Sequence, residues 1–172
     1  MTSRVFVDTN VLVYAEDATA GVKRSRARSL ITELASSGAL VLSTQILQEL
    51  YNVVTRKLGI SAIIARSLVE DYSKLDVVLV RPEVILGAID LNRMHALSLW
   101  DALVIKCASV AGCSRVLSED LQHGQSIDGV RIENPFLSVT GAAKPRARYS
   151  TGPRAAQNRT ASTTGRAHRA RR

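Results

Sequence analysis

Apolar residues along the chain follow two alternating patterns, short continuous runs and longer stripes with helical spacing. The continuous runs predict buried strands over residues 4–7, 39–42, 76–80, 115–117 and 130–132. The stripes, in which apolar residues recur at i, i+3, i+4 and i+7, predict helices over residues 23–36, 45–58, 61–75, 82–95 and 99–111. A shorter helix is predicted to begin near Val11, and the 61–75 stripe is expected to turn Ile64 and Tyr72 inward.

The order of these elements indicates the fold class. Strands alternate with helices, and we identify no hairpin signal, so residues 118–129 are expected to form a polar loop. This order is typical of right-handed β–α–β units and predicts an α/β fold with a mostly parallel sheet. Hydrophobic residues make up 46% of the chain and aromatic residues 4%, so the core is expected to be aliphatic.

The length of 172 residues fits a single domain, but charge is distributed unevenly along it. Residues 141–172 hold nine Lys and Arg and no acid, which leaves 14 basic against 15 acidic residues in 1–140. The net charge of +8 therefore comes from the C-terminal segment. Because that segment also lacks an apolar period, we predict a domain over residues 1–138 and a basic, disordered tail over 139–172.

Two features bear on where the protein works. Apolar runs reach about five residues, against roughly 18 for a membrane span, so we expect a soluble cytoplasmic protein without membrane association. Cys107 and Cys113 lie six residues apart and form neither a CxxC motif nor a zinc-binding pattern. They are interpreted as reduced core residues.

Two carboxylates follow predicted strands. Asp8 comes directly after the first run, and Asp120 lies just past the strand at 115–117. Either has an ordinary explanation, because Asp is a common helix N-cap and a common turn residue. The carboxyl ends of parallel strands, however, meet at the edge of a sheet where α/β proteins bind ligands.

Two further carboxylates lie on predicted helices. Glu49 falls on the apolar side of its helix, between Ile46 and Val53, where it must be paired, protonated or bound to a cation. A small error in the helix orientation would instead place it at the surface. Asp101 follows Ser98 by three residues, which is also the pattern of a capping box.

Together, these acids suggest a metal site. Four carboxylates gathered at one edge would repel one another and be driven to protonate, unless a cation neutralised them. Mg²⁺ and Mn²⁺ prefer oxygen ligands and commonly leave positions for water and phosphate. We therefore interpret Asp8, Glu49, Asp101 and Asp120 as a candidate metal-dependent nuclease site.

Four blocks of sequence also resemble the successive motifs of the PIN domain family, in particular VapC-type ribonuclease toxins of toxin–antitoxin modules. These blocks are VFVDTNVLVYA, TQILQELYNVVTRKL, LSLWDALVIKCA and RVLSEDLQHG, followed by IENPF, and the resemblance covers residues 3–137. It implies a three-layer α/β/α fold, Mg²⁺- or Mn²⁺-dependent cleavage of RNA, a small antitoxin partner and a possible homodimer.

The same resemblance assigns expected roles to individual residues. Asp8, Glu49 and Asp101 match the family's metal-site acids, and Asp120 matches the acid of its fourth motif. Thr9, Asn10 and Ser118 match supporting polar positions, whereas Glu119 is an extra acid without an assigned role. The basic tail departs from the pattern, and either adds salt-sensitive RNA affinity or has no function. An alternative to the nuclease is a module with this fold that binds RNA or protein without cleavage.

Overall fold

A computed structural model describes residues 3–140, and within this part of the chain the strands form one six-stranded sheet. The strands are β1 (Val5–Val7), β2 (Leu40–Ser43), β3 (Asp76–Val78), β4 (Arg115–Leu117), β5 (Ser126–Ile127) and β6 (Val130–Glu133). Their order is β3-β2-β1-β4-β6-β5, and every neighbouring pair is parallel except β5 with β6. The predicted mostly parallel sheet is therefore confirmed. The predicted tail lies outside the described residues from position 141 onward.

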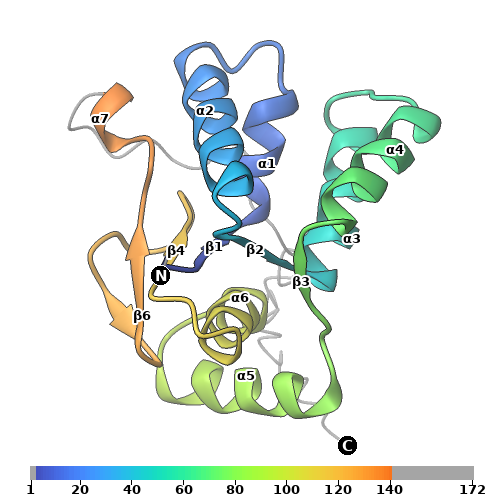
Figure 1. The fold of residues 1–172 in the computed structure, drawn as a ribbon. Coiled ribbons are helices and arrows are strands. Elements are labelled where there is room, and N and C mark those ends of the chain that lie inside the picture. Colours follow the sequence, from blue (N-terminus) through green and yellow to red (C-terminus); the bar gives the residue numbers. More distant parts are fainter. Residues whose placement is uncertain (1–2, 141–172) are drawn as a thin grey trace, which may run out of the picture.

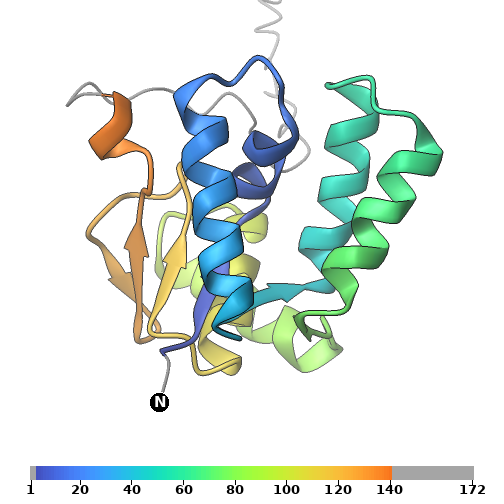
Figure 2. The same cartoon turned by 45° about the horizontal axis from the view of Figure 1, so that its top comes forward.

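Helices cover both faces of the sheet, as a three-layer α/β/α fold requires. They are α1 (Thr9–Glu16), α2 (Val22–Ser36), α3 (Thr44–Arg56), α4 (Ala62–Ser73), α5 (Pro82–Met94), α6 (Leu99–Val110) and α7 (Leu137–Thr140). The pairs α1–α2 and α3–α4 stand on one side of the strands, and α5 and α6 lie on the other (Figure 1). A view from another angle shows the two upper pairs side by side, with α7 next to α2 (Figure 2).

Central strands β1 and β2 are buried along their whole length, because helices cover both of their faces. This explains why their sequences are continuous apolar runs rather than alternating ones. The core is mainly aliphatic, with Phe6, Tyr14 and Phe136 among its largest fully buried side chains. Cys107 and Cys113 are buried and free, as their spacing predicted.

The chain order creates a switch point between β1 and β4. From β1 the sheet grows through β2 to β3, and the chain then returns through α5 and α6 to place β4 on the other side of β1. Val7 pairs with Leu117 at the carboxyl ends of these strands, and the Asp8 backbone N–H donates to the Leu117 carbonyl at 3.0 Å. Ligand sites of open α/β sheets form at such points.

The expectation of a featureless loop over 118–129 is wrong, since the loop contains β5, which forms an antiparallel hairpin with β6. Asp128 and Gly129 connect the two strands with φ angles of 51° and 78°. Two successive positive φ angles are typical of a type I′ turn, for which Asp-Gly is a favoured sequence. The dipeptide was therefore a hairpin signal.

Helix α4 is also rotated from the predicted orientation. Ile64 was expected to face inward but is 57% exposed, whereas the next residue, Ala65, is fully buried. Tyr72 is partly buried against the core, as predicted. Since α4 packs mainly against α3, a narrow stripe of contact is sufficient and Ile64 falls outside it. In residues 3–140 no helix is long and apolar enough to cross a membrane.

The hairpin turn provides a test of this fold. Gly129→Ala should lower the free energy of unfolding by about 1 kcal/mol or more, because a side chain at φ 78° is strained. No atom lies within 4 Å of the added Cβ, so steric contact would not contribute. Gly129→Asn is the matched control, and its free energy of unfolding should fall less, since Asn tolerates positive φ. Urea unfolding measures both, and equal stability of all three proteins would contradict the turn.

Candidate active site

Four separate segments bring the predicted acids to the carboxyl edge of the sheet. Asp8 ends β1 and caps α1, where its Oδ1 accepts a hydrogen bond from the Thr9 backbone N–H at 2.7 Å. Asp120 lies in the loop after β4, Glu49 in the middle of α3 and Asp101 in the first turn of α6. The helix-cap interpretation of Asp8 is therefore geometrically correct, and it leaves the second carboxylate oxygen available for other contacts.

Asn10 and Ser118 join Asp8 to Asp120. The Asn10 side-chain amide donates to Asp8 Oδ2 at 2.8 Å and to Asp120 Oδ2 at 3.2 Å. The Ser118 hydroxyl donates to Asp8 Oδ2 at 2.6 Å and accepts from the Asp120 backbone N–H at 3.2 Å. Both residues are fully buried, so the two acids are held by rigid neighbours.

Glu49 is held from two directions. The Thr9 hydroxyl donates to Glu49 Oε2 at 2.8 Å, and the Gln45 amide donates to Oε1 at 2.9 Å. This places Glu49 beside the start of α1, as its position on the apolar side of α3 indicated. The sequence analysis missed Gln45, although a polar residue four positions before a half-buried acid on one helix was an available signal.

Asp101 combines a local helix contact with a long-range charge effect. The Ser98 hydroxyl donates to Asp101 Oδ2 at 2.8 Å and accepts from the Asp101 backbone N–H at 3.1 Å. The capping motif is thus present, although the acid receives the hydroxyl proton rather than a bond from the Ser98 backbone. The negative charge of Asp101 also raises the pKa of both Glu49 and Asp120, so it acts on the same cluster.

Burial makes these carboxylates difficult to ionise. The pKa of Asp8 is raised to about 8, mainly by desolvation and further by the charges of Asp120 and Glu49. Desolvation likewise raises the pKa of Asp120 to about 6 and that of Glu49 above its usual value. The hydrogen bonds from Ser118 and Asn10 act in the opposite direction but do not cancel the effect. Near neutral pH the cluster therefore retains a proton, chiefly on Asp8, unless a bound cation favours the ionised carboxylates.

Glu119, the acid without a predicted role, is neutralised inside the protein. Its side chain is fully buried, accepts a hydrogen bond from the Tyr14 hydroxyl at 2.5 Å and forms an ion pair with Lys23. Lys23 also lies over the Tyr14 and Phe136 rings. Although Lys23 belongs to the basic residues near the start of α2, its ammonium group is therefore directed into the protein rather than into solvent. Glu119 thereby anchors the segment that carries Ser118 and Asp120. Its backbone N–H also donates to Asn10 Oδ1 at 3.3 Å.

The donor chemistry of the cluster fits a hard divalent cation. In the described part of the chain, no group of three or more His, Cys, Asp and Glu side chains is arranged as a ready-made metal site. The predicted acids nevertheless offer only oxygen donors, and burial together with mutual repulsion raises the pKa values of Asp8 and Asp120, an effect that a bound cation would offset. We therefore regard these acids as a candidate metal centre.

Comparisons with known proteins concern the fold as a whole. The sequence pattern of the PIN domain family matches residues 5–125. The VapC20 toxin of Mycobacterium tuberculosis, described as cleaving the sarcin–ricin loop, is similar in structure, with a TM-score of 0.54 and 20% identity over 65% of this chain and 86% of that one.

Two further solved structures are toxin–antitoxin complexes bound to DNA. VapBC from Salmonella typhimurium has a chain with a TM-score of 0.58 and 19% identity, over 78% of this chain and 99% of that one. VapBC2 from Rickettsia felis, bound to promoter DNA, has a chain with a TM-score of 0.56 and 16% identity, over 76% of this chain and 97% of that one. At these identities the likeness extends to the fold alone. A search of curated proteins finds no significant match.

The raised pKa of Asp8 predicts a pH-dependent stability. In EDTA the free energy of unfolding should fall as the pH rises from about 4 to about 8, because the folded protein retains a proton that the unfolded chain releases. Asp8→Asn cannot ionise and should lose less stability across this range, by at least about 1 kcal/mol, since one pKa unit corresponds to about 1.4 kcal/mol. Urea unfolding at about pH 5 and about pH 8 measures the difference. Identical losses in the two proteins would contradict it.

Proposed function

Because the chain belongs to the PIN domain family, we propose that it is a divalent-metal-dependent endoribonuclease and the toxin of a toxin–antitoxin pair. The observation that carries the proposal is the gathering of Asp8, Glu49 and Asp120, each with a raised pKa, around the switch point of the sheet. Asp101 adds its charge to the same cluster. Family members generally use divalent metal ions, which fits this all-oxygen donor set.

Asp8, Glu49, Asp101 and Asp120 would hold Mg²⁺ or Mn²⁺ through their carboxylates. When bound, such an ion supplies positive charge for phosphate oxygens and lowers the pKa of a coordinated water. Thr9 orients Glu49, and Ser118 orients Asp8, so that neither carboxylate is free to rotate away. Asn10 spans Asp8 and Asp120 and keeps them on the same side of β1 and β4.

A protein partner is part of the proposal. Structural neighbours from Salmonella typhimurium and Rickettsia felis were crystallised as VapBC complexes bound to DNA. By analogy, we expect a small antitoxin with a DNA-binding segment to associate with this chain and block its activity. A short reading frame that adjoins or overlaps the gene and encodes such a segment would support the pairing.

Cleavage of RNA should depend on both the metal and Asp8. The purified protein is expected to cut a mixture of cellular RNA in Mg²⁺ or Mn²⁺, to leave 5′-phosphate ends and to lose activity in EDTA. Asp8→Asn should reduce the cleavage rate by about 100-fold or more, since it removes a charged group buried at the centre of the cluster. The matched control, Asp90→Asn, changes an exposed acid on α5 and should keep full activity.

Two outcomes would reject the nuclease. Cleavage that persists in EDTA, or an Asp8→Asn protein with full activity, would contradict the proposed chemistry. In isothermal titration, absence of Mn²⁺ binding, or Mn²⁺ binding that is unchanged in the Asp8→Asn and Asp101→Asn double variant, would favour the binding module instead.

Asn10 should be nearly as important as the acids, although it carries no charge. Asn10→Ala removes the amide that spans Asp8 and Asp120 and should lower activity by about 10- to 100-fold. The effect should appear as weaker Mn²⁺ binding in calorimetry as well as slower cleavage. Asn52→Ala, an exposed site on α3, is the control. Unchanged Mn²⁺ affinity in Asn10→Ala would argue against this role.

A further inference from the structure

A pocket of about 280 Å³ is lined by Gln45, which contacts Glu49, and by Trp100, which precedes Asp101 in the chain. Its walls combine the Trp100 ring and aliphatic side chains with the amides of Gln45 and Gln48, and none of its lining residues is charged. The volume is near the lower end of small-ligand sites, which span roughly 300 to 1,000 Å³. A neutral pocket of this kind suits a flat polar ring better than a phosphate.

The pocket shares its helices with the acids. Gln45 lies one turn before Glu49 on α3 and donates to its Oε1 at 2.9 Å. Trp100 directly precedes Asp101 in the first turn of α6. A group in the pocket would therefore lie next to whatever the acids bind.

Gln45 has an unused hydrogen-bond acceptor. Among the described residues, its Oε1 is the one buried side-chain oxygen or nitrogen without a hydrogen-bond partner. The amide nitrogen is committed to Glu49, so the amide cannot turn over without losing that contact. A buried acceptor without a partner is costly, and such atoms in folded proteins require an explanation. A ligand N–H would supply the missing partner.

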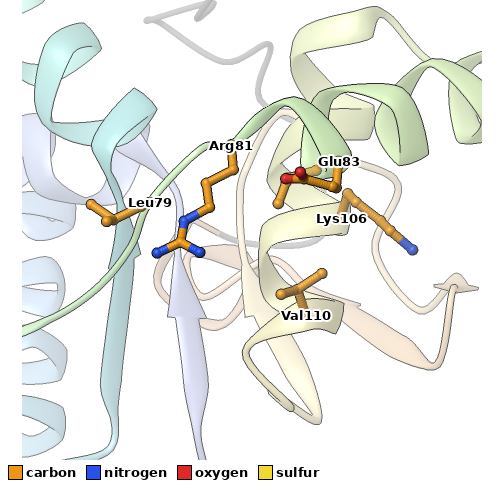
Figure 3. A pocket seen from close by; sticks show the side chains of 6 residues that line it. Leu79, Arg81, Glu83, Lys106 and Val110 are labelled. Atoms are coloured by element: carbon orange, nitrogen blue, oxygen red, sulfur yellow. The ribbon is translucent and has the colours of Figure 1, made fainter.

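Another pocket, of about 560 Å³, lacks these features. Figure 3 shows its labelled side chains, which come from the segment that leads into α5, from the first turn of α5 and from α6. Its lining is charged, with Arg81, Glu83 and Lys106, and Lys106 is paired with Asp128 at 2.9 Å. Its lining residues include no aromatic side chain on which a base could stack.

We propose that the pocket lined by Trp100 and Gln45, here called the base pocket, receives one nucleobase of the RNA beside the phosphate held at the acids. The base would stack on the Trp100 ring and donate an N–H to Gln45 Oε1. Stacking on aromatic rings and hydrogen bonds to exposed base edges are the usual means of reading single-stranded RNA. This inference rests on the proposed function and adds a source of base selectivity to it.

Trp100 is the one tryptophan of the chain, so its fluorescence reports directly on the base pocket. The Asp8→Asn protein, in which cleavage is expected to be slow, would be titrated in Mg²⁺ with the four homopolymeric RNA tetranucleotides and with a tetramer that lacks its bases. We expect saturable quenching by the base-containing RNAs, with affinities that differ among them. The abasic tetramer should bind at least about fivefold more weakly, because base–aromatic stacking contributes to affinity.

Variants of the same background separate stacking from hydrogen bonding, with binding followed by the anisotropy of labelled RNA. Trp100→Ala should weaken binding by about 5- to 100-fold, and Trp100→Phe should restore most of it. Gln45→Met keeps the length of the side chain but removes both the acceptor and the amide that holds Glu49. It should weaken RNA binding by about 3- to 10-fold, and the loss of the acceptor should appear as reduced discrimination among bases. Tyr51→Ala and Asn52→Ala, on exposed sites of α3, are the matched controls.

Several results would overturn the base pocket. These are equal affinity for abasic and base-containing RNA, absence of Trp100 quenching, or normal RNA binding by Trp100→Ala. A Trp100→Ala protein that binds RNA normally but no longer binds a co-expressed antitoxin would assign the pocket to a protein partner. If the parent chain cleaves RNA but RNA does not quench Trp100, the base pocket is rejected and the nuclease is kept. If RNA quenches Trp100 but is not cleaved, the nuclease is rejected and the base pocket is kept.

Discussion

The burial of the Asp8 carboxylate is the constraint on which the site depends. Only 2% of the residue is exposed, and the protein surrounds it with donors from Thr9, Asn10 and Ser118. These donors meet because β1 and β4 pair in parallel with Val7 beside Leu117. A shift of the register by one residue would turn the side chains of the shifted strand to the opposite face of the sheet and would separate these donors. The sheet register therefore determines the electrostatics of the site.

Two adjacent acids after β4 show how differently the protein can treat a buried charge. Glu119 is paired with Lys23 inside the fold and needs nothing further. Asp120 faces the other acids, and its pKa is raised to about 6 by desolvation and by neighbouring negative charges. The first arrangement fixes the loop, and the second leaves a charge for an external cation to balance. Functional sites commonly retain such a local cost in stability.

The sequence predicted what depends on local pattern and missed what depends on orientation. Continuous apolar runs located every described strand except β5, whose Asp-Gly turn was a local signal that the pattern of runs does not contain. Strand ends located Asp8 and Asp120, because parallel strands share one edge. The exposure of Ile64 and the pairing of Lys23 with Glu119 depend on how helices rotate and pack, which periodicity does not determine. The assignment of the four acids as metal ligands remains a proposal, since proximity and charge support it but do not test it.

Two of the acids, Glu49 and Asp101, lie on α3 and α6, which also line the base pocket, and this has a consequence for specificity. Gln45 fixes Glu49 through its amide nitrogen, and its oxygen would contact the base, so one side chain would serve the cluster and the reading of RNA together. A base without an N–H directed at this oxygen would leave a buried acceptor unpaired, and the resulting desolvation cost would weaken the binding of that base. Because Gln45 is itself buried, that penalty would act on the position of Glu49. Selection of the base and arrangement of the acids are therefore expected to be coupled rather than independent.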